Sequence, residues 1–131
     1  MPIPASSPGL VILHPAIRSG CESLYESGHY REAVERGFKI VRNQLRALTN
    51  YETGSDAFGK GRLHIRGAIE SHVDVDFQSA IQFLLMSIDK FRNEKAHTVD
   101  AGVRSRERAY EYLVLSSLAM HHLDNAEIRR D

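Results

Sequence analysis

The sequence predicts an all-α protein, an antiparallel helical bundle of four to five helices with a long Gly-rich loop between two of them. Apolar residues recur at helical spacing in four separate segments. No group of segments alternates apolar and polar residues as the strands of a sheet would. The chain has 131 residues, which is enough for one hydrophobic core and too few for two independent ones.

Four helices are expected along the chain. The first covers residues 17–25 and ends before Gly28, a residue type that favours helix C-termini. Residues 30–48 carry apolar side chains on one face and predict a second helix of about five turns. These two helices would form a tight hairpin. Residues 77–91 and 109–123 show the same spacing and predict the third and fourth helices.

The remaining segments set the expected boundaries. Residues 1–12 are rich in Pro and Ser and predict a flexible arm. The helical domain is expected to cover residues 13–124, and residues 125–131 are expected to form a C-terminal tail. Residues 53–61 predict a flexible loop. They also match the first seven positions of a phosphate-binding P-loop, but Gly61 stands where a hydroxyl is needed for magnesium, and the preceding segment is a helix end.

Composition narrows the function classes. The chain has 17 Lys and Arg and 17 Asp and Glu, so its net charge is zero, which excludes a protein that coats nucleic acid through its overall charge. Cys21 is the single cysteine, so an intrachain disulfide is excluded and a small core residue is expected. The apolar stretches are too short for a membrane span, and residues 1–12 lack the basic start of a secretory signal. A cytoplasmic protein is expected.

One acidic and histidine cluster has metal-ligating residue types. His72, Asp74 and Asp76 alternate, so in an extended segment they would point the same way and could hold a metal ion. The commoner arrangement is that Asp74 or Asp76 caps the helix that begins near Phe77. We expect capping.

The other histidines give no stronger metal signal. His121 and His122 are adjacent, hence about 100° apart on a helix, which is poor geometry for chelation. His14 and His29 stand at helix starts, where structural roles are common. The sequence therefore predicts no metal and no cofactor.

The segment from Phe91 to His97 holds the candidate catalytic residues. It ends an apolar helix with a run of polar groups and precedes a turn expected near residue 101. Between Lys90 and Arg108 there are six basic and three acidic residues, a local net charge of +3. Antiparallel helices on either side would gather these charges at one end of the bundle, where they could hold a phosphate backbone. The residues expected to contact RNA are Lys90, Lys95, Arg104, Arg106 and Arg108.

The candidate catalytic residues are Arg92, Asn93 and His97. Asn93 and His97 are four residues apart and share a helical face, so the amide can orient the imidazole. Arg92 and His97 converge on one phosphate only if the helix ends between them or a second subunit contributes. Spacing alone favours the simpler interpretation that Arg92 caps a helix end and His97 is an ordinary terminal residue.

Three motifs in order resemble a known family. Leu13-His14-Pro15, the run from Gly28 to Val34, and Arg92-Asn93-x-x-Ala96-His97 are similar to the Abi-like, Ymh-type family of the HEPN superfamily. The resemblance covers most of residues 13–124. It implies a helical bundle that dimerises and places two Arg-His motifs across a shared cleft. Many superfamily members are metal-independent RNases that act as toxins or antiphage abortive-infection effectors, and others only bind nucleotides or partners.

Two positions depart from the family pattern. Glu94 stands where members commonly have Pro, and an acid there could weaken RNA binding. Val99 stands where some toxins carry a Tyr that a partner enzyme modifies.

The resulting hypothesis is a metal-independent endoribonuclease. RNA supplies its 2′-hydroxyl as nucleophile, Arg92 would hold the phosphate, and His97 from each subunit of a homodimer would act as base or acid. Asn93 would orient His97. Two alternatives stay open: a non-catalytic module that binds nucleotides or a protein, and an effector held by a partner protein or antitoxin in a defence system. A bundle without any ligand is a third.

Overall fold

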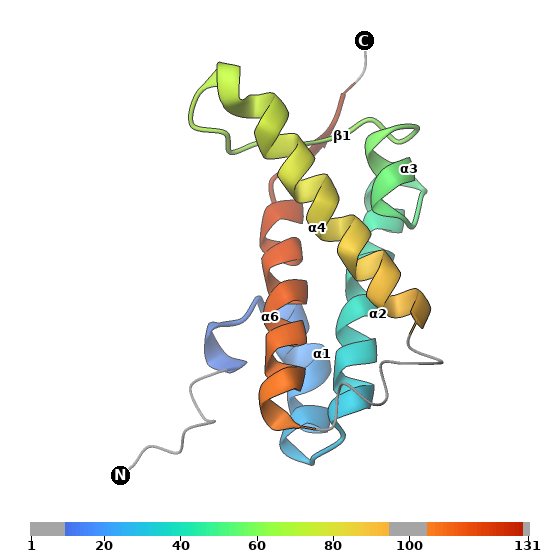
Figure 1. Cartoon of the computed structure of the whole chain (residues 1–131), viewed down its shortest axis with the longest axis vertical. Helices are drawn as coiled ribbons and strands as arrows, with labels where there is room; N and C mark the ends of the chain where they lie inside the picture. The colour runs from blue at the N-terminus through green and yellow to red at the C-terminus, as the bar shows by residue number, and fades with distance from the viewer. Residues whose placement is uncertain (1–9, 95–104, 130–131) are drawn as a thin grey trace.

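The computed structural model describes residues 10–94 and 105–129, with side chains through residue 92 in the first range. It confirms the all-α class: four long helices form the bundle (Figure 1). These are α1 (Pro15–Glu26), α2 (Tyr30–Thr49), α4 (Asp74–Glu94) and α6 (Arg106–Leu123). The shorter elements are the 3-10 helices η1 (Leu10–Ile12) and η2 (Ser71–Val73), the helix α3 (Gly54–Phe58), and the strands β1 (Leu63–Ile65) and β2 (Ala126–Ile128).

The hairpin of α1 and α2 forms as expected. Pro15 begins α1, where its missing N–H is not needed, and Nδ1 of His14 accepts a hydrogen bond from the Ala16 N–H at 3.0 Å. Gly28 follows the helix with φ of +86°, a left-handed conformation that glycine adopts at little cost. The chain therefore reverses within three residues and starts α2 at Tyr30.

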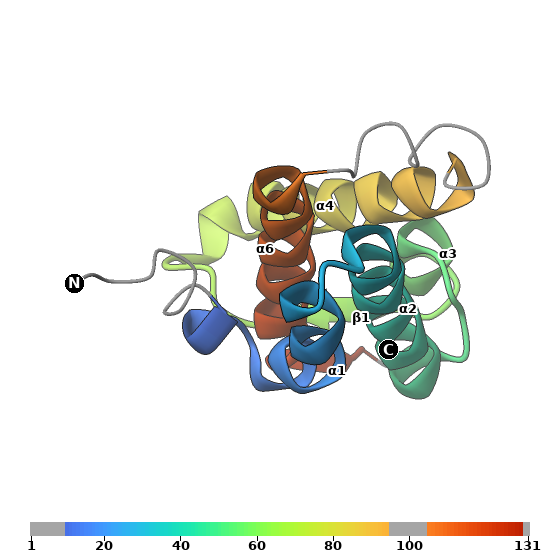
Figure 2. The ribbon, with the colours of Figure 1, turned by 90° about the horizontal axis from the view of Figure 1, so that it is seen from below.

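The core lies around α2. Helices α1 and α6 pack along it, and α4 crosses α6 and α2 on another side (Figures 1 and 2). Cys21 belongs to this core, and burial raises the pKa of its thiol to about 11. The thiol is therefore protonated at neutral pH, as suits a packing residue. The buried apolar residues of α2 are Ala33, Val34, Phe38, Val41 and Leu45.

The prediction of a flexible loop at residues 53–61 is wrong for Gly54–Phe58, which form α3. The hydroxyl of Thr53 accepts a hydrogen bond from the Asp56 N–H and caps this short helix. A Cβ placed on Gly54 would lie 2.8 Å from Cβ of Leu85, and one on Gly61 would lie 2.7 Å from the Ala57 carbonyl oxygen. The glycines thus permit close packing, and the apparent P-loop is a helix against α4.

A two-stranded antiparallel sheet closes the upper end of the bundle. Strands β1 and β2 pair Leu63 with Ile128 and Ile65 with Ala126. Residues 126–128, within the segment expected as a tail, supply β2. Three-residue strands are too short to show alternation, so periodicity carries no signal for them. None of the helices in the described ranges is long and apolar enough to cross a membrane.

Candidate functional site

Aromatic packing positions the end of α4, where Arg92 lies. Phe91 stacks on Phe38 of α2, with ring centroids 6.3 Å apart and an interplanar angle of 13°. Tyr112 of α6 meets both rings edge-on, 5.2 Å from Phe91 and 5.7 Å from Phe38. Such pairs each contribute about 0.5–1.5 kcal/mol beyond area burial. The cluster fixes the last turns of α4 on α2 and α6, and it holds Arg92 beside α2.

A groove with a volume of about 360 Å³ opens beside Arg92. It combines the end of α4 with the exposed side of α2 and one residue of α1, and Figure 2 shows α1 and α4 flanking α2. One lining residue is apolar and six are charged. The residues that line this α2–α4 groove are Leu24, Glu32, Glu35, Arg36, Lys39, Arg42 and Arg92.

Positive charge dominates the α2–α4 groove. Four of its residues are basic and two are acidic, and Glu35 is already paired with Arg31 at 3.2 Å. The Nε atoms of Arg42 and Arg92 are buried and have no hydrogen-bond partner within the described part of the chain. Leaving a buried donor unpaired costs about 1–3 kcal/mol. The groove is therefore lined by two arginines that each carry an unpaired buried donor.

Asp89 lies one turn before Arg92 but serves the fold. Its Oδ2 accepts a hydrogen bond from the Gly54 N–H at 2.8 Å, which ties α4 to the start of α3. Burial raises the pKa of this carboxyl, while the Gly54 hydrogen bond and the charge of Arg92 lower it. Asp89 thus attracts Arg92 through charge, and its hydrogen-bonding oxygen is occupied by α3.

Three residues of the basic patch expected from the sequence are described, and none of them lines the α2–α4 groove. The guanidinium of Arg106 lies over the ring of Tyr25, 5.7 Å from its centroid. Arg108 is exposed and paired with Glu111 at 2.8 Å. Lys90 is exposed on α4 and does not line the groove. Two of these cations therefore already have partners.

Several predicted site residues lie outside the described residues. Asn93 lies in the last turn of α4, and its side chain is not among those described. Lys95, His97 and Arg104 also fall outside the described ranges. Among the predicted catalytic residues, Arg92 is the one that the described side chains place.

Metal-ligating side chains meet at the junction of α1 and α6. Ligand atoms of His14, His121 and Asp124 lie within 4.8 Å of one another. Nδ1 of His14 accepts the Ala16 N–H, so the proton of the neutral ring is on Nε2, which lies 2.9 Å from Oδ2 of Asp124. A metal at Nε2 would need the other tautomer and would break the α1 cap. This geometry favours a histidine–aspartate hydrogen bond that joins α1 to α6.

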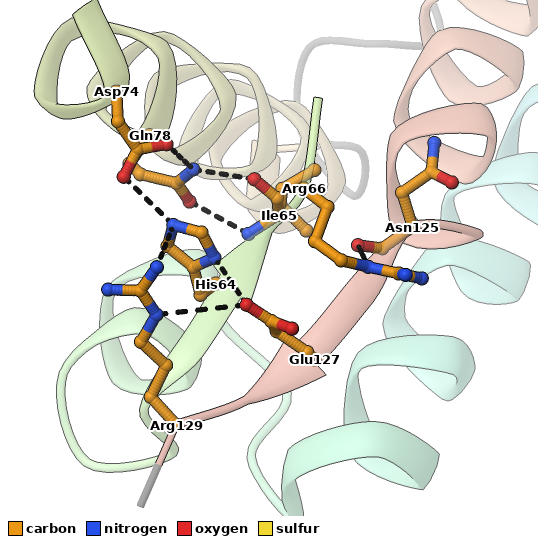
Figure 3. A network of polar contacts seen from close by, with 8 residues as sticks. All are labelled: His64, Ile65, Arg66, Asp74, Gln78, Asn125, Glu127 and Arg129. Atoms are coloured by element: carbon orange, nitrogen blue, oxygen red, sulfur yellow. Dashed lines mark hydrogen bonds and ion pairs between the residues drawn. The ribbon is translucent and has the colours of Figure 1, made fainter. Parts of the chain in front are cut away.

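A second polar cluster surrounds His64 of β1 (Figure 3). Its Nδ1 lies 2.9 Å from Glu127, and its Nε2 lies 2.9 Å from both Asp74 and Arg129. A protonated ring donates to both carboxylates, whereas a neutral ring donates to Glu127 and accepts from Arg129. The amide of Gln78 bonds both the N–H and the carbonyl of Ile65. All these partners join β1, β2 and the start of α4, so the cluster is structural.

The cap expected at residue 74 or 76 takes another form. Helix α4 begins at Asp74, directly after η2. The Asp74 carboxylate binds His64 and Gln78 at 2.9 Å each, and these bonds lower its pKa. His72 pairs with Glu70 at 3.2 Å instead of joining the aspartates. Asp74 therefore ties α4 to β1.

Three groove residues were missed from the sequence. Arg36, Lys39 and Arg42 follow one another at three-residue spacing on the second helix, a pattern that could have marked an inclined basic row. Only the docking of α4 shows that Arg92 joins it.

Comparison with known proteins places the chain in a family. A protein-family model described as "Protein of unknown function (Hypoth_ymh)" matches residues 12–123. No curated protein and no solved structure matches the chain. The match covers the four long helices and Arg92. The chain belongs to the Hypoth_Ymh family.

Proposed function

We propose that this protein is a metal-independent endoribonuclease of the HEPN type, acting on RNA in the cytoplasm. The observation that carries the proposal is the unpaired, buried Nε of Arg92 in a groove with three further cations. Arg92 is also the first residue of the Arg-Asn-x-x-x-His motif, which ends at His97. An arginine that binds the phosphate and a histidine that moves protons are the groups that phosphodiester cleavage needs.

The reaction balances with groups of the chain and the RNA. His97 as base takes the proton of the 2′-hydroxyl, whose oxygen attacks the adjacent phosphorus. The bond from phosphorus to the 5′-oxygen breaks, and that oxygen receives a proton from a second His97, supplied by the partner in a two-fold homodimer. Arg92 binds the non-bridging oxygens through its planar fork and stabilises the charge of the transition state. The products are a 2′,3′-cyclic phosphate and a 5′-hydroxyl.

The test is cleavage of total RNA in EDTA by purified protein. Wild type is expected to produce fragments with 2′,3′-cyclic phosphate ends. His97→Ala and Arg92→Ala are each expected to cleave roughly 100- to 10,000-fold more slowly while keeping the fold. Arg18→Ala is the matched control, because Arg18 pairs with Glu22 on the outside of α1 and does not line the groove.

Two outcomes would contradict the proposal. Cleavage by both site variants at the wild-type rate would remove Arg92 and His97 from the mechanism. Intact RNA in every lane, with circular dichroism showing folded protein, would favour the non-catalytic alternative. In that alternative the α2–α4 groove binds a nucleotide or a partner protein, and a toxin–antitoxin or antiphage defence complex supplies the context.

A further inference from the structure

We infer that Arg36, Lys39 and Arg42 of α2 bind the phosphate backbone of single-stranded RNA next to Arg92. This inference rests on the proposed function for the identity of the RNA as substrate, but not on the cleavage chemistry. It moves the main RNA contact from the segment between Lys90 and Arg108 to the outer side of α2. The groove lining given above is its geometric basis.

The three α2 residues form an inclined row along the helix. Residues three apart on an α-helix rise by about 4.5 Å and turn by about 60° from alignment, so their side chains follow one another around the helix surface. Side chains three residues apart are neighbours on the helix surface, so one strand can contact the three basic residues in turn.

The three residues of this row differ in how deeply they are buried. Arg36 and Lys39 are exposed, whereas Arg42 is half-buried and its Nε is cut off from water without a hydrogen-bond partner in the described structure. The stem of Arg36 lies alongside Gly20 of α1. The stem of Arg36 thus rests on α1, and all three side chains line the groove.

The acidic residues limit where an anion can lie. Glu35 is neutralised by Arg31 at 3.2 Å. Glu32 is exposed in the first turn of α2 and repels a polyanion at that end. A strand would therefore lie over Lys39, Arg42 and Arg92, with Arg36 at its margin.

Groove size and arginine chemistry favour a single RNA strand. The groove has a volume of about 360 Å³, at the lower end of the range for small-molecule sites, so it admits a short part of one strand, whereas a double helix would touch only its rim. Three of the four groove cations are arginines, whose planar fork matches phosphate oxygens in pairs. An acidic peptide carries its charges at the ends of flexible side chains and pays more entropy to fit this row.

The experiment measures binding of a probe that cannot be cleaved. A fluorescent 12-nucleotide 2′-O-methyl oligouridine lacks the nucleophile, so its fluorescence anisotropy reports binding alone. We compare wild type, Lys39→Ala/Arg42→Ala, and the charge-matched Arg18→Ala/Lys60→Ala, whose residues are exposed and outside the groove. The salt concentration is varied from about 50 to about 300 mM, a range over which counterion release changes the affinity measurably.

The groove variant is expected to bind about 10- to 100-fold more weakly at low salt. Its slope of log K against log salt should fall by about 1.4, because each lost contact to a single strand removes about 0.7. The control variant should keep the wild-type affinity and slope to within about twofold. Arg42→Lys, which preserves the charge but lacks the planar fork, should bind with an affinity between those of the wild type and the groove variant. Circular dichroism of each variant excludes a folding artefact.

The outcomes separate this inference from the proposed function. Loss of binding in the groove variant, together with wild-type cleavage by His97→Ala, would support the groove and reject the catalytic assignment. Equal binding by the groove and control variants would overturn the assignment of RNA binding to the groove, whatever the cleavage result. Tighter binding of a polyglutamate peptide than of the oligouridine would also overturn it, in favour of an acidic protein partner.

Discussion

Replacing Arg42 by methionine should stabilise the fold while it weakens RNA binding. The side chain of Arg42 is half-buried on α2, and its Nε is buried without a hydrogen-bond partner in the described ranges. Methionine keeps an unbranched apolar stem that can pack on the same surface, and it removes the unpaired donor. It also removes repulsion between Arg42 and the other groove cations.

The magnitude follows from the cost of the unpaired donor. A buried N–H without a partner costs about 1–3 kcal/mol, and part of this gain is offset by rotamer entropy and imperfect packing of the new side chain. We expect a net rise of about 1 kcal/mol in the free energy of unfolding. In a domain of this size that corresponds to a Tm increase of about 3–5 °C.

Urea and thermal unfolding, followed by circular dichroism at the helical band, measure this change. The matched control is Arg46→Met, one turn further along α2, where Arg46 is exposed and paired with Glu52 at 3.0 Å. Losing an exposed pair should change the free energy of unfolding by about 0–1 kcal/mol, with no gain. A loss of 1 kcal/mol or more in Arg42→Met would refute the reasoning, because it would mean that the guanidinium stabilises the empty groove.

Two further predictions concern the elements around the groove. Gly54→Ala should lower the free energy of unfolding by about 1–3 kcal/mol, because the new Cβ would lie 2.8 Å from Cβ of Leu85 and 3.1 Å from the Met86 nitrogen. Chemical denaturation measures this loss, and an unchanged midpoint would contradict the prediction. Asp74 has a lowered pKa in the folded state because it bonds His64, so the stability it contributes is present above its unfolded pKa and is lost as the pH falls through the folded one. Asp74→Asn should therefore be less stable than wild type at pH 7. The difference should begin to shrink as the pH falls below about 4, the ordinary pKa of Asp, and should disappear only below the lowered pKa of the folded state. A difference that stays constant would contradict this linkage.

The long helices could be predicted from the sequence because each buries one continuous face. The spacing of Phe38, Val41 and Leu45 within residues 30–48 indicates α2 almost to its ends. The residues around Gly54 were misread, because glycines that permit close packing look the same in sequence as glycines that permit flexibility. The contact with Leu85 that distinguishes the two cases exists only in the folded chain.

The sequence singles out Arg92 but not the α2 cations that line the groove beside it. The local excess of positive charge between Lys90 and Arg108 drew the prediction to Arg106 and Arg108, because a net charge counts residues without asking which ones are paired. In the fold Arg106 stacks on Tyr25 and Arg108 pairs with Glu111. Free charge, rather than total charge, is what attracts a phosphate.

The position of the free charge follows from the core. Phe91 locks the end of α4 against Phe38, and Phe38 lies on the same helix as Lys39 and Arg42. The apolar contact that stabilises the bundle therefore also brings Arg92 to the basic row of α2. A phosphate bound there would face four cations, and a ligand that binds only the folded chain stabilises it, so RNA binding should raise the Tm. We expect the uncleavable oligouridine to raise the Tm of the wild type but not that of Lys39→Ala/Arg42→Ala. That result would show that the α2–α4 groove is the place where the RNA binds.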